Sequence, residues 1–129
     1  MRRPATETEK FEALVARAIE ALPWKFRRRL ENIDVVVQDW PSREQLNQAG
    51  LRSRWQLLGL YEGVPLTERG IRYNLVPPDK ITIFQGPIEA MCRTPEEMEA
   101  EVGRVVRHEI AHHFGLSDER LEALESERD

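Results

Sequence analysis

The chain has 129 residues, 40% of them hydrophobic, and a formal net charge of −4. This length suits one domain spanning residues 1–129, with a core that needs no disulfide, and the single cysteine, Cys92, allows none within the chain. The acidic balance argues against nucleic acid as a partner. No apolar run approaches the ~20 residues of a membrane span, and the N-terminus lacks the apolar segment of a secretory signal. We therefore expect a cytoplasmic protein without a membrane partner; its oligomeric state stays open.

The N-terminal quarter of the sequence predicts two helices. Apolar residues recur every three or four positions over 6–22, and Thr6 followed by Glu9 matches the capping-box pattern of a helix start. A proline ends this run, and a short second helix is expected over 24–31. We interpret the three arginines at 27–29 as a solvated helix face rather than a nucleic-acid contact.

The middle of the chain predicts strands separated by turns. The β-branched run at 33–38 is typical of a strand, and a serine then begins a short helix over 42–49 that a glycine closes. Glycines and prolines make 57–70 a loop or hairpin with apolar anchors, followed by a short strand at 71–75. The second clear strand is expected at 80–85, and the Gly-Pro pair after it is expected to end it.

The best-marked helix is expected over 95–114. Thr94 is a suitable N-cap, Pro95 occupies the first helical position, and Glu97 completes a predicted capping box. Gly115 is well placed for the left-handed residue just past the helix. The inward stripe comprises Met98, Val102, Val105, Val106, Ile110 and Phe114.

These elements together predict an α+β fold. A small mixed or antiparallel sheet is expected to pack against the helix over 95–114, with the other helices around it. A last short amphipathic helix is expected from about Asp118.

All three histidines lie on the second half of the long predicted helix. His108, Glu109 and His112 form an H-E-x-x-H motif, and positions i and i+4 share one helix face. Both imidazoles can therefore reach one zinc ion, while Glu109, about 100° round the helix, can reach a water on the metal without binding the metal itself. His113 is expected to point away from the metal face.

The third metal ligand is expected at Asp118. A left-handed turn at Gly115 reverses the chain, so that this carboxylate can return to the metal. The alternative role of Asp118 is the N-cap of the last helix, and Glu119 or Glu122 would then replace it as ligand.

Two imidazoles and one carboxylate leave one zinc position open for water, which is the mark of a catalytic site. Zinc lowers the pKa of a bound water toward ~7, and Glu109 would accept its proton and pass it to the leaving amine. The sequence therefore predicts an enzyme with one Zn²⁺ per chain, a metallopeptidase that acts on a peptide or protein substrate.

The chain resembles the zincin metallopeptidases, and more closely a family of small bacterial zincin-like proteins. The resemblance rests on HEIAHHFGLSDERL (108–121), ITIFQGPIE (81–89), LGLYEGVPL (58–66) and LPWKFRRRLENIDVVVQD (22–39). It implies that His108 and His112 bind the metal, that Glu109 is the catalytic base and that Asp118 is the third ligand. In zincins a strand beside the active helix binds the substrate as an added strand; residues 81–85 are the candidate, and the alternative is that they form a central core strand.

Two features depart from the zincin pattern. No methionine follows Asp118, and no residue stands out as a partner for the oxyanion, although Tyr61 and Tyr73 are candidates. The alternative function is therefore a non-catalytic, zinc-binding interaction module. Glu109 argues against that alternative, because a structural site has no use for a base beside the metal.

Overall fold

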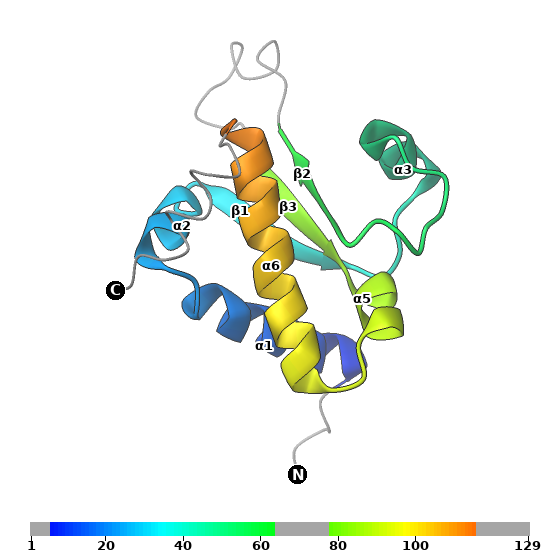
Figure 1. The fold of residues 1–129 in the computed structure, drawn as a ribbon, viewed down its shortest axis with the longest axis horizontal. Helices are drawn as coiled ribbons and strands as arrows, with labels where there is room; N and C mark the ends of the chain where they lie inside the picture. Colours follow the sequence, from blue (N-terminus) through cyan, green and yellow to red (C-terminus); the bar gives the residue numbers. More distant parts are fainter. Residues whose placement is uncertain (1–5, 64–77, 116–129) are drawn as a thin grey trace.

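The computed structural model describes residues 6–63 and 78–115. Figure 1 shows the path of the chain through them. The elements follow in the order α1 (Glu7–Glu20), α2 (Trp24–Arg29), β1 (Ile33–Gln38), α3 (Arg43–Ala49), β2 (Gly59–Glu62), β3 (Asp79–Phe84), α5 (Gln85–Met91) and α6 (Pro95–His113). No helix within these described stretches is both long enough and apolar enough to cross a membrane.

The three strands form one mixed sheet in the order β1-β3-β2. β1 runs parallel to β3, with Val35 opposite Ile81, and β2 runs antiparallel to β3, with Tyr61 opposite Ile81. β3 is therefore the central strand, and the sheet with its surrounding helices confirms the predicted α+β class.

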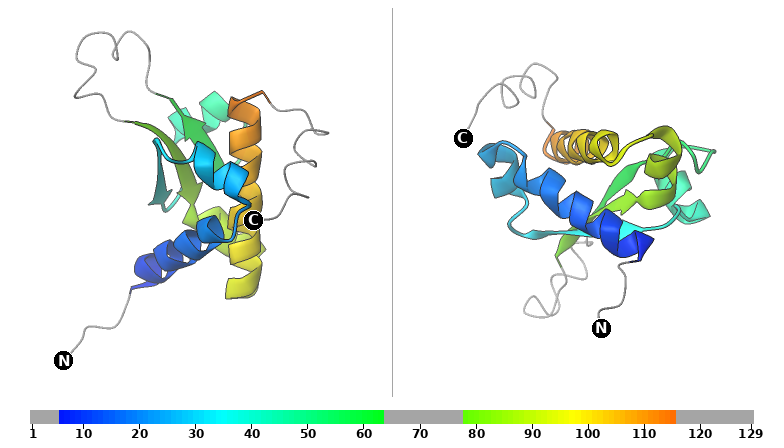
Figure 2. Two further views of the ribbon diagram at one scale, coloured as in Figure 1. Left: turned by 90° about the vertical axis from the view of Figure 1, so that its left-hand side faces the viewer. Right: turned by 90° about the horizontal axis from the view of Figure 1, so that it is seen from below.

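The core lies between one face of the sheet and the helices α1, α2 and α6. α6 contacts both of these helices as well as α5, β2 and β3, and the side view in Figure 2 shows it running along the sheet. β3 contributes Ile81 and Ile83 to this core. They point to the same face because side chains of a strand alternate between faces, and both are fully buried. The fully buried residues of α6 are Val102, Val106 and Ile110. The helix that carries the three histidines thus belongs to the core that holds the molecule together.

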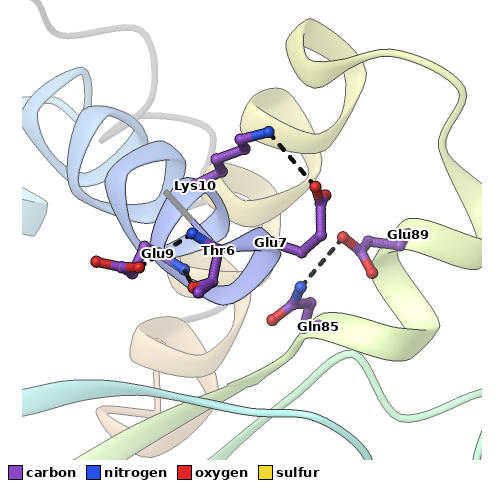
Figure 3. Close-up of polar contacts among 6 residues, drawn as sticks. All are labelled: Thr6, Glu7, Glu9, Lys10, Gln85 and Glu89. Carbon is purple, nitrogen blue, oxygen red and sulfur yellow. Dashed lines mark hydrogen bonds and ion pairs between the residues drawn. The ribbon is translucent and has the colours of Figure 1, made fainter. Parts of the chain in front are cut away.

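The predicted helix starts are largely confirmed. Thr6 and Glu9 exchange two hydrogen bonds of 3.0 Å between side chain and backbone, which is the capping box drawn in Figure 3. At α6, the Thr94 hydroxyl accepts a hydrogen bond from the Glu97 N–H. The capping box predicted there is incomplete, because the Glu97 carboxylate accepts from the N–H of Arg93 instead.

Two elements differ from the sequence prediction. The segment predicted as loop or hairpin contains the strand β2, and the Gly-Pro pair expected to end a strand lies inside the helix α5. α5 begins at Gln85, whose amide donates to the Glu89 carboxylate (Figure 3), and Pro87 is tolerated because the first helical turn needs no N–H from it. Phe114, predicted to face inward, is 46% exposed. The strand predicted at 71–75 and the helix predicted from Asp118 lie outside the described residues.

A polar network on the other face of the sheet connects α3 to β2. The Gln38 side-chain amide donates to Gln45, and the Gln45 amide donates to the Glu62 carboxylate at 3.2 Å. Thr82, fully buried on β3, donates to the same Glu62 oxygen at 3.0 Å. Buried polar groups need such partners, and the network fixes α3 beside the end of β2.

Candidate metal centre

The helix α6 presents His108 and His112 on one exposed side. Their ring centroids are 6.4 Å apart, with a 38° angle between the ring planes, as expected of side chains one helical turn apart. Both residues line the same cleft, and Glu109 lies between them in the chain. The structure therefore brings the three residues of the H-E-x-x-H motif to one place.

Glu109 contacts the strand β2 directly. Its Oε1 accepts a hydrogen bond of 2.8 Å from the backbone N–H of Tyr61. Burial raises the pKa of the Glu109 carboxyl above its ordinary value, while the Tyr61 N–H and the imidazoles of His108 and His112 act in the opposite direction. Burial disfavours the charged form of a carboxyl, so Glu109 holds a proton more readily than an exposed glutamate does.

A cleft of about 850 Å³ opens over this group. Its walls come from α6, from β2, from the end of α3 and from the stretch between α3 and β2, and they include His108, Glu109, His112, Tyr61 and Gln48. A site with convergent polar groups in a concave surface is the usual setting for ligand binding.

The strand beside the cleft is β2, and the expectation that residues 81–85 bind substrate is wrong. β3 is hydrogen-bonded on both sides, so it has no edge to offer, and the alternative of a central core strand holds. β2 pairs only with β3 within the described chain. Leu58 accepts a hydrogen bond from Phe84, its directly opposite residue, and antiparallel alternation then turns the N–H and C=O of Gly59 and Tyr61 away from β3.

The side chain of Tyr61 is bound on the helix side of the sheet. Its hydroxyl donates to Asp79 Oδ2 at 2.8 Å, and its ring stacks on His113 with centroids 3.7 Å apart. This hydrogen bond argues against the Tyr61 hydroxyl as the oxyanion partner. The other candidate, Tyr73, lies outside the described residues. His113, expected to point away from the metal face, stacks on Tyr61 and lines the same cleft as His108 and His112.

Two of the described residues can occupy two of the four ligand positions of a zinc site. His108 and His112 supply two imidazoles that open into the cleft, and zinc binds imidazole nitrogen readily. Within residues 6–63 and 78–115, no group of three His, Cys, Asp or Glu side chains is arranged to hold a metal ion. The predicted third ligand, Asp118, and its alternatives Glu119 and Glu122 lie outside the described residues. Gly115 has the predicted left-handed backbone, with φ of 66°.

A helix that carries H-E-x-x-H along a cleft, beside the antiparallel edge strand of a small mixed sheet, has the arrangement of the zincin class. The family model of the zincin-like metallopeptidases matches residues 30–128. The chain therefore belongs to the zincin-like metallopeptidase family.

Comparison with other proteins adds a structural relative. The chain is similar to the structure of a conserved hypothetical protein from T. thermophilus, with 28% sequence identity and a TM-score of 0.53. The match covers 83% of this chain and 92% of that one. No curated protein matches the chain significantly.

Some residues of the site were not apparent from the sequence. The contact between Tyr61 and Glu109 joins positions 48 apart, and the short strand β2 has too few alternating residues to distinguish it from a loop. Arg104 also lines the cleft. The sequence signal for this position is that Arg104 precedes His108 by four residues and so shares its side of the helix.

Proposed function

We propose that this protein is a zinc-dependent metallopeptidase in which His108, His112 and Asp118 hold the metal and Glu109 is the general base. The observation that supports this most strongly is the position of Glu109. It lies beside two imidazoles, in a cleft, and in contact with an edge strand. A structural zinc site would need neither the cleft nor the carboxylate.

The edge of β2 supports a peptide as the substrate. The N–H and C=O of Gly59 turn away from β3 and match the hydrogen-bonding pattern of an extended chain, whereas the Tyr61 N–H on the same edge donates to Glu109. A peptide added there runs past Glu109, because the Tyr61 N–H already touches that carboxylate. The strand therefore sets the position of the scissile bond relative to the base.

The chemistry divides between the metal and the chain. Zinc, when bound, supplies the Lewis acidity that polarises the peptide carbonyl and makes water nucleophilic near neutral pH. Glu109 accepts the proton of the attacking water on its carboxylate and then donates it to the nitrogen of the leaving amine. Partial burial supports this shuttling, because a raised carboxyl pKa lowers the cost of holding the proton between the two transfers.

Metal content and turnover of matched variants test the proposal. Protein purified without chelator or histidine tag should contain one zinc per chain, and His112→Ala should lose it. Glu109→Gln should keep the zinc but lower the cleavage of a peptide pool by at least about 100-fold, as expected for loss of a general base. Glu96→Gln, an exposed glutamate at the other end of α6, is the matched control and should behave as wild type.

Two results would contradict the proposal. If the wild-type chain takes up no zinc, the metal centre and the hydrolase function both fall. If zinc binds but wild type and Glu109→Gln are equally inert across peptide pools, the protein is a zinc-binding interaction module.

A further inference from the structure

The cleft extends beyond the H-E-x-x-H residues to an arginine. Arg104 precedes His108 by four residues, so both lie on the same side of α6. Among the described residues that line the cleft, Arg104 is the only arginine or lysine. A permanent positive charge in a peptide-binding cleft is a natural partner for a carboxylate.

The guanidinium of Arg104 is held in place by Glu101 and keeps a further N–H donor for a ligand. Its Nε donates to Glu101 Oε1 at 2.8 Å, and its Nη2 contacts the same oxygen. The side chain of Glu101 is 16% exposed, whereas that of Arg104 is 53% exposed. In the described part of the chain, Nη1 has no hydrogen-bond partner. Anchoring by Glu101 reduces the entropy lost when a ligand binds.

The acidic residues of the cleft do not compete strongly for this arginine. The Glu62 carboxylate accepts hydrogen bonds from Gln45 and Thr82 on the other face of the sheet. The Glu109 carboxylate accepts from the Tyr61 N–H. The part of the Arg104 guanidinium that Glu101 does not engage therefore remains available to an anionic ligand in the cleft.

The position of Arg104 fixes where along a peptide the carboxylate would lie. Four helical residues span about 6 Å of the α6 axis, and an extended chain advances about 3.3 Å per residue. Gly59 lies against Val105, the neighbour of Arg104, so Arg104 is at the end of the cleft where the chain enters β2. The distance from His108 corresponds to about two substrate residues.

We propose that Arg104 forms a subsite for a substrate carboxylate about two residues from the scissile bond. The carboxylate belongs either to an aspartate or glutamate side chain or to the C-terminus of a short peptide. The placement of the scissile bond rests on the proposed peptidase function; the affinity of the subsite for a carboxylate does not. The protein then prefers acidic peptides in spite of its own negative net charge.

Paired peptides test the subsite and separate the two sources of the carboxylate. One series replaces Gln by Glu at each position of an amidated peptide; a second compares the same neutral peptides as free acids and as C-terminal amides. Binding to zinc-loaded Glu109→Gln is measured by fluorescence anisotropy, which requires no turnover, and kcat/KM is measured with the Glu109 enzyme. We expect one series to show about tenfold tighter binding of the acidic member. This preference should shrink between ~50 mM and ~500 mM salt, because the arginine is half exposed.

Variants assign the preference to the arginine. In the Glu109→Gln background, Arg104→Gln should reduce the ratio of acid to neutral affinity to about one, while Arg104→Lys should keep part of it, because lysine retains the charge but not the fork of donors. Arg93→Gln removes an arginine outside the cleft and should keep the full preference. Circular dichroism confirms that each variant is folded.

The outcomes distinguish this proposal from the peptidase function. If peptides are cleaved but acidic and neutral members bind equally, the subsite is wrong and the peptidase function stands. If no peptide is cleaved but an acid preference exists and is lost in Arg104→Gln, the subsite stands and the peptidase function falls. An acid preference that survives Arg104→Gln also overturns the subsite.

Discussion

Glu109 on α6 and Cys92, at the end of α5, both have a raised pKa, and the main cause is the same. Burial is the largest contribution for both. At Cys92 the nearby carboxylates of Glu101 and Glu97 add to the effect, whereas at Glu109 the surrounding imidazoles and the Tyr61 N–H oppose it. The same desolvation therefore favours the protonated form of both side chains, and it makes the thiol less reactive.

The reactivity of the Cys92 thiol tests whether its pKa is raised. Because the thiolate is the reactive form and burial with two neighbouring carboxylates raises the pKa of the thiol, the folded protein has less thiolate at about pH 8 than an ordinary cysteine does. Alkylation by iodoacetamide, followed by mass spectrometry, should be several times slower in the native protein than in the same chain unfolded in urea. The native rate should keep rising through the pH range in which the unfolded rate levels off. Faster reaction of the native protein would contradict the assignment.

At the scale of elements, the close approach of β2 to α6 shapes the site. A Cβ placed on Gly59 would lie 2.4 Å from Val105 Cγ1, so only glycine allows the strand to pass this near the helix. The approach brings the Tyr61 N–H to Glu109. The distance between the edge strand β2 and the helix α6 thus depends on the absence of a side chain at Gly59.

Gly59→Ala should separate these two elements. The added methyl group overpacks the contact with Val105, so we expect the free energy of unfolding in urea to fall by about 1–3 kcal/mol. Peptide cleavage should fall as well, since β2 shifts relative to Glu109. The matched control is Gly63→Ala, where the new Cβ would meet Asp79 Oδ1 at an ordinary 3.6 Å; its effect should stay within about 0.5 kcal/mol.

A second substitution checks the cause. Val105→Ala removes the atom that the new methyl group meets, so the double variant should be more stable than the sum of the two single effects predicts. Strict additivity would show that the loss in Gly59→Ala has another origin.

For the whole molecule, the helix that carries the H-E-x-x-H motif, α6, is also the central helix of the core. α6 packs against α1, α2 and the sheet, and its buried side chains face inward while His108 and His112 face the cleft. The rigidity of the His108–His112 pair therefore comes from residues far away in sequence. A site on a rigid element is held more accurately than one on a loop.

Phe26→Ala should show this dependence. Phe26 of α2 is fully buried in the core that α6 shares, and its truncation should lower the free energy of unfolding by about 3–5 kcal/mol. Trp24→Ala in the same helix, at a residue that is 41% exposed, should cost clearly less. Urea denaturation of both variants makes the comparison; equal losses would contradict the assignment of the core.

Features of this protein whose interactions are local could be predicted from the pattern of residues alone. The caps of α1, α3 and α6, the left-handed glycines and the shared helix face of His108 and His112 all follow from contacts within four residues. Such contacts form between neighbours in the chain, so the pattern of residue types is enough to predict them.

Three features depend on how distant elements pack together: the strand that lies at the edge, the residues that contact Glu109 and the side chains that complete the cleft. A four-residue strand has too little alternation to be recognised, and its pairing with β3 depends on partners across the long segment that separates the two. The contact of Tyr61 with Glu109, and the positions of Arg104 and His113 in the cleft, arise from packing between distant elements. Local propensity carries no information about such contacts, because their energy exists only once the sheet and α6 have come together.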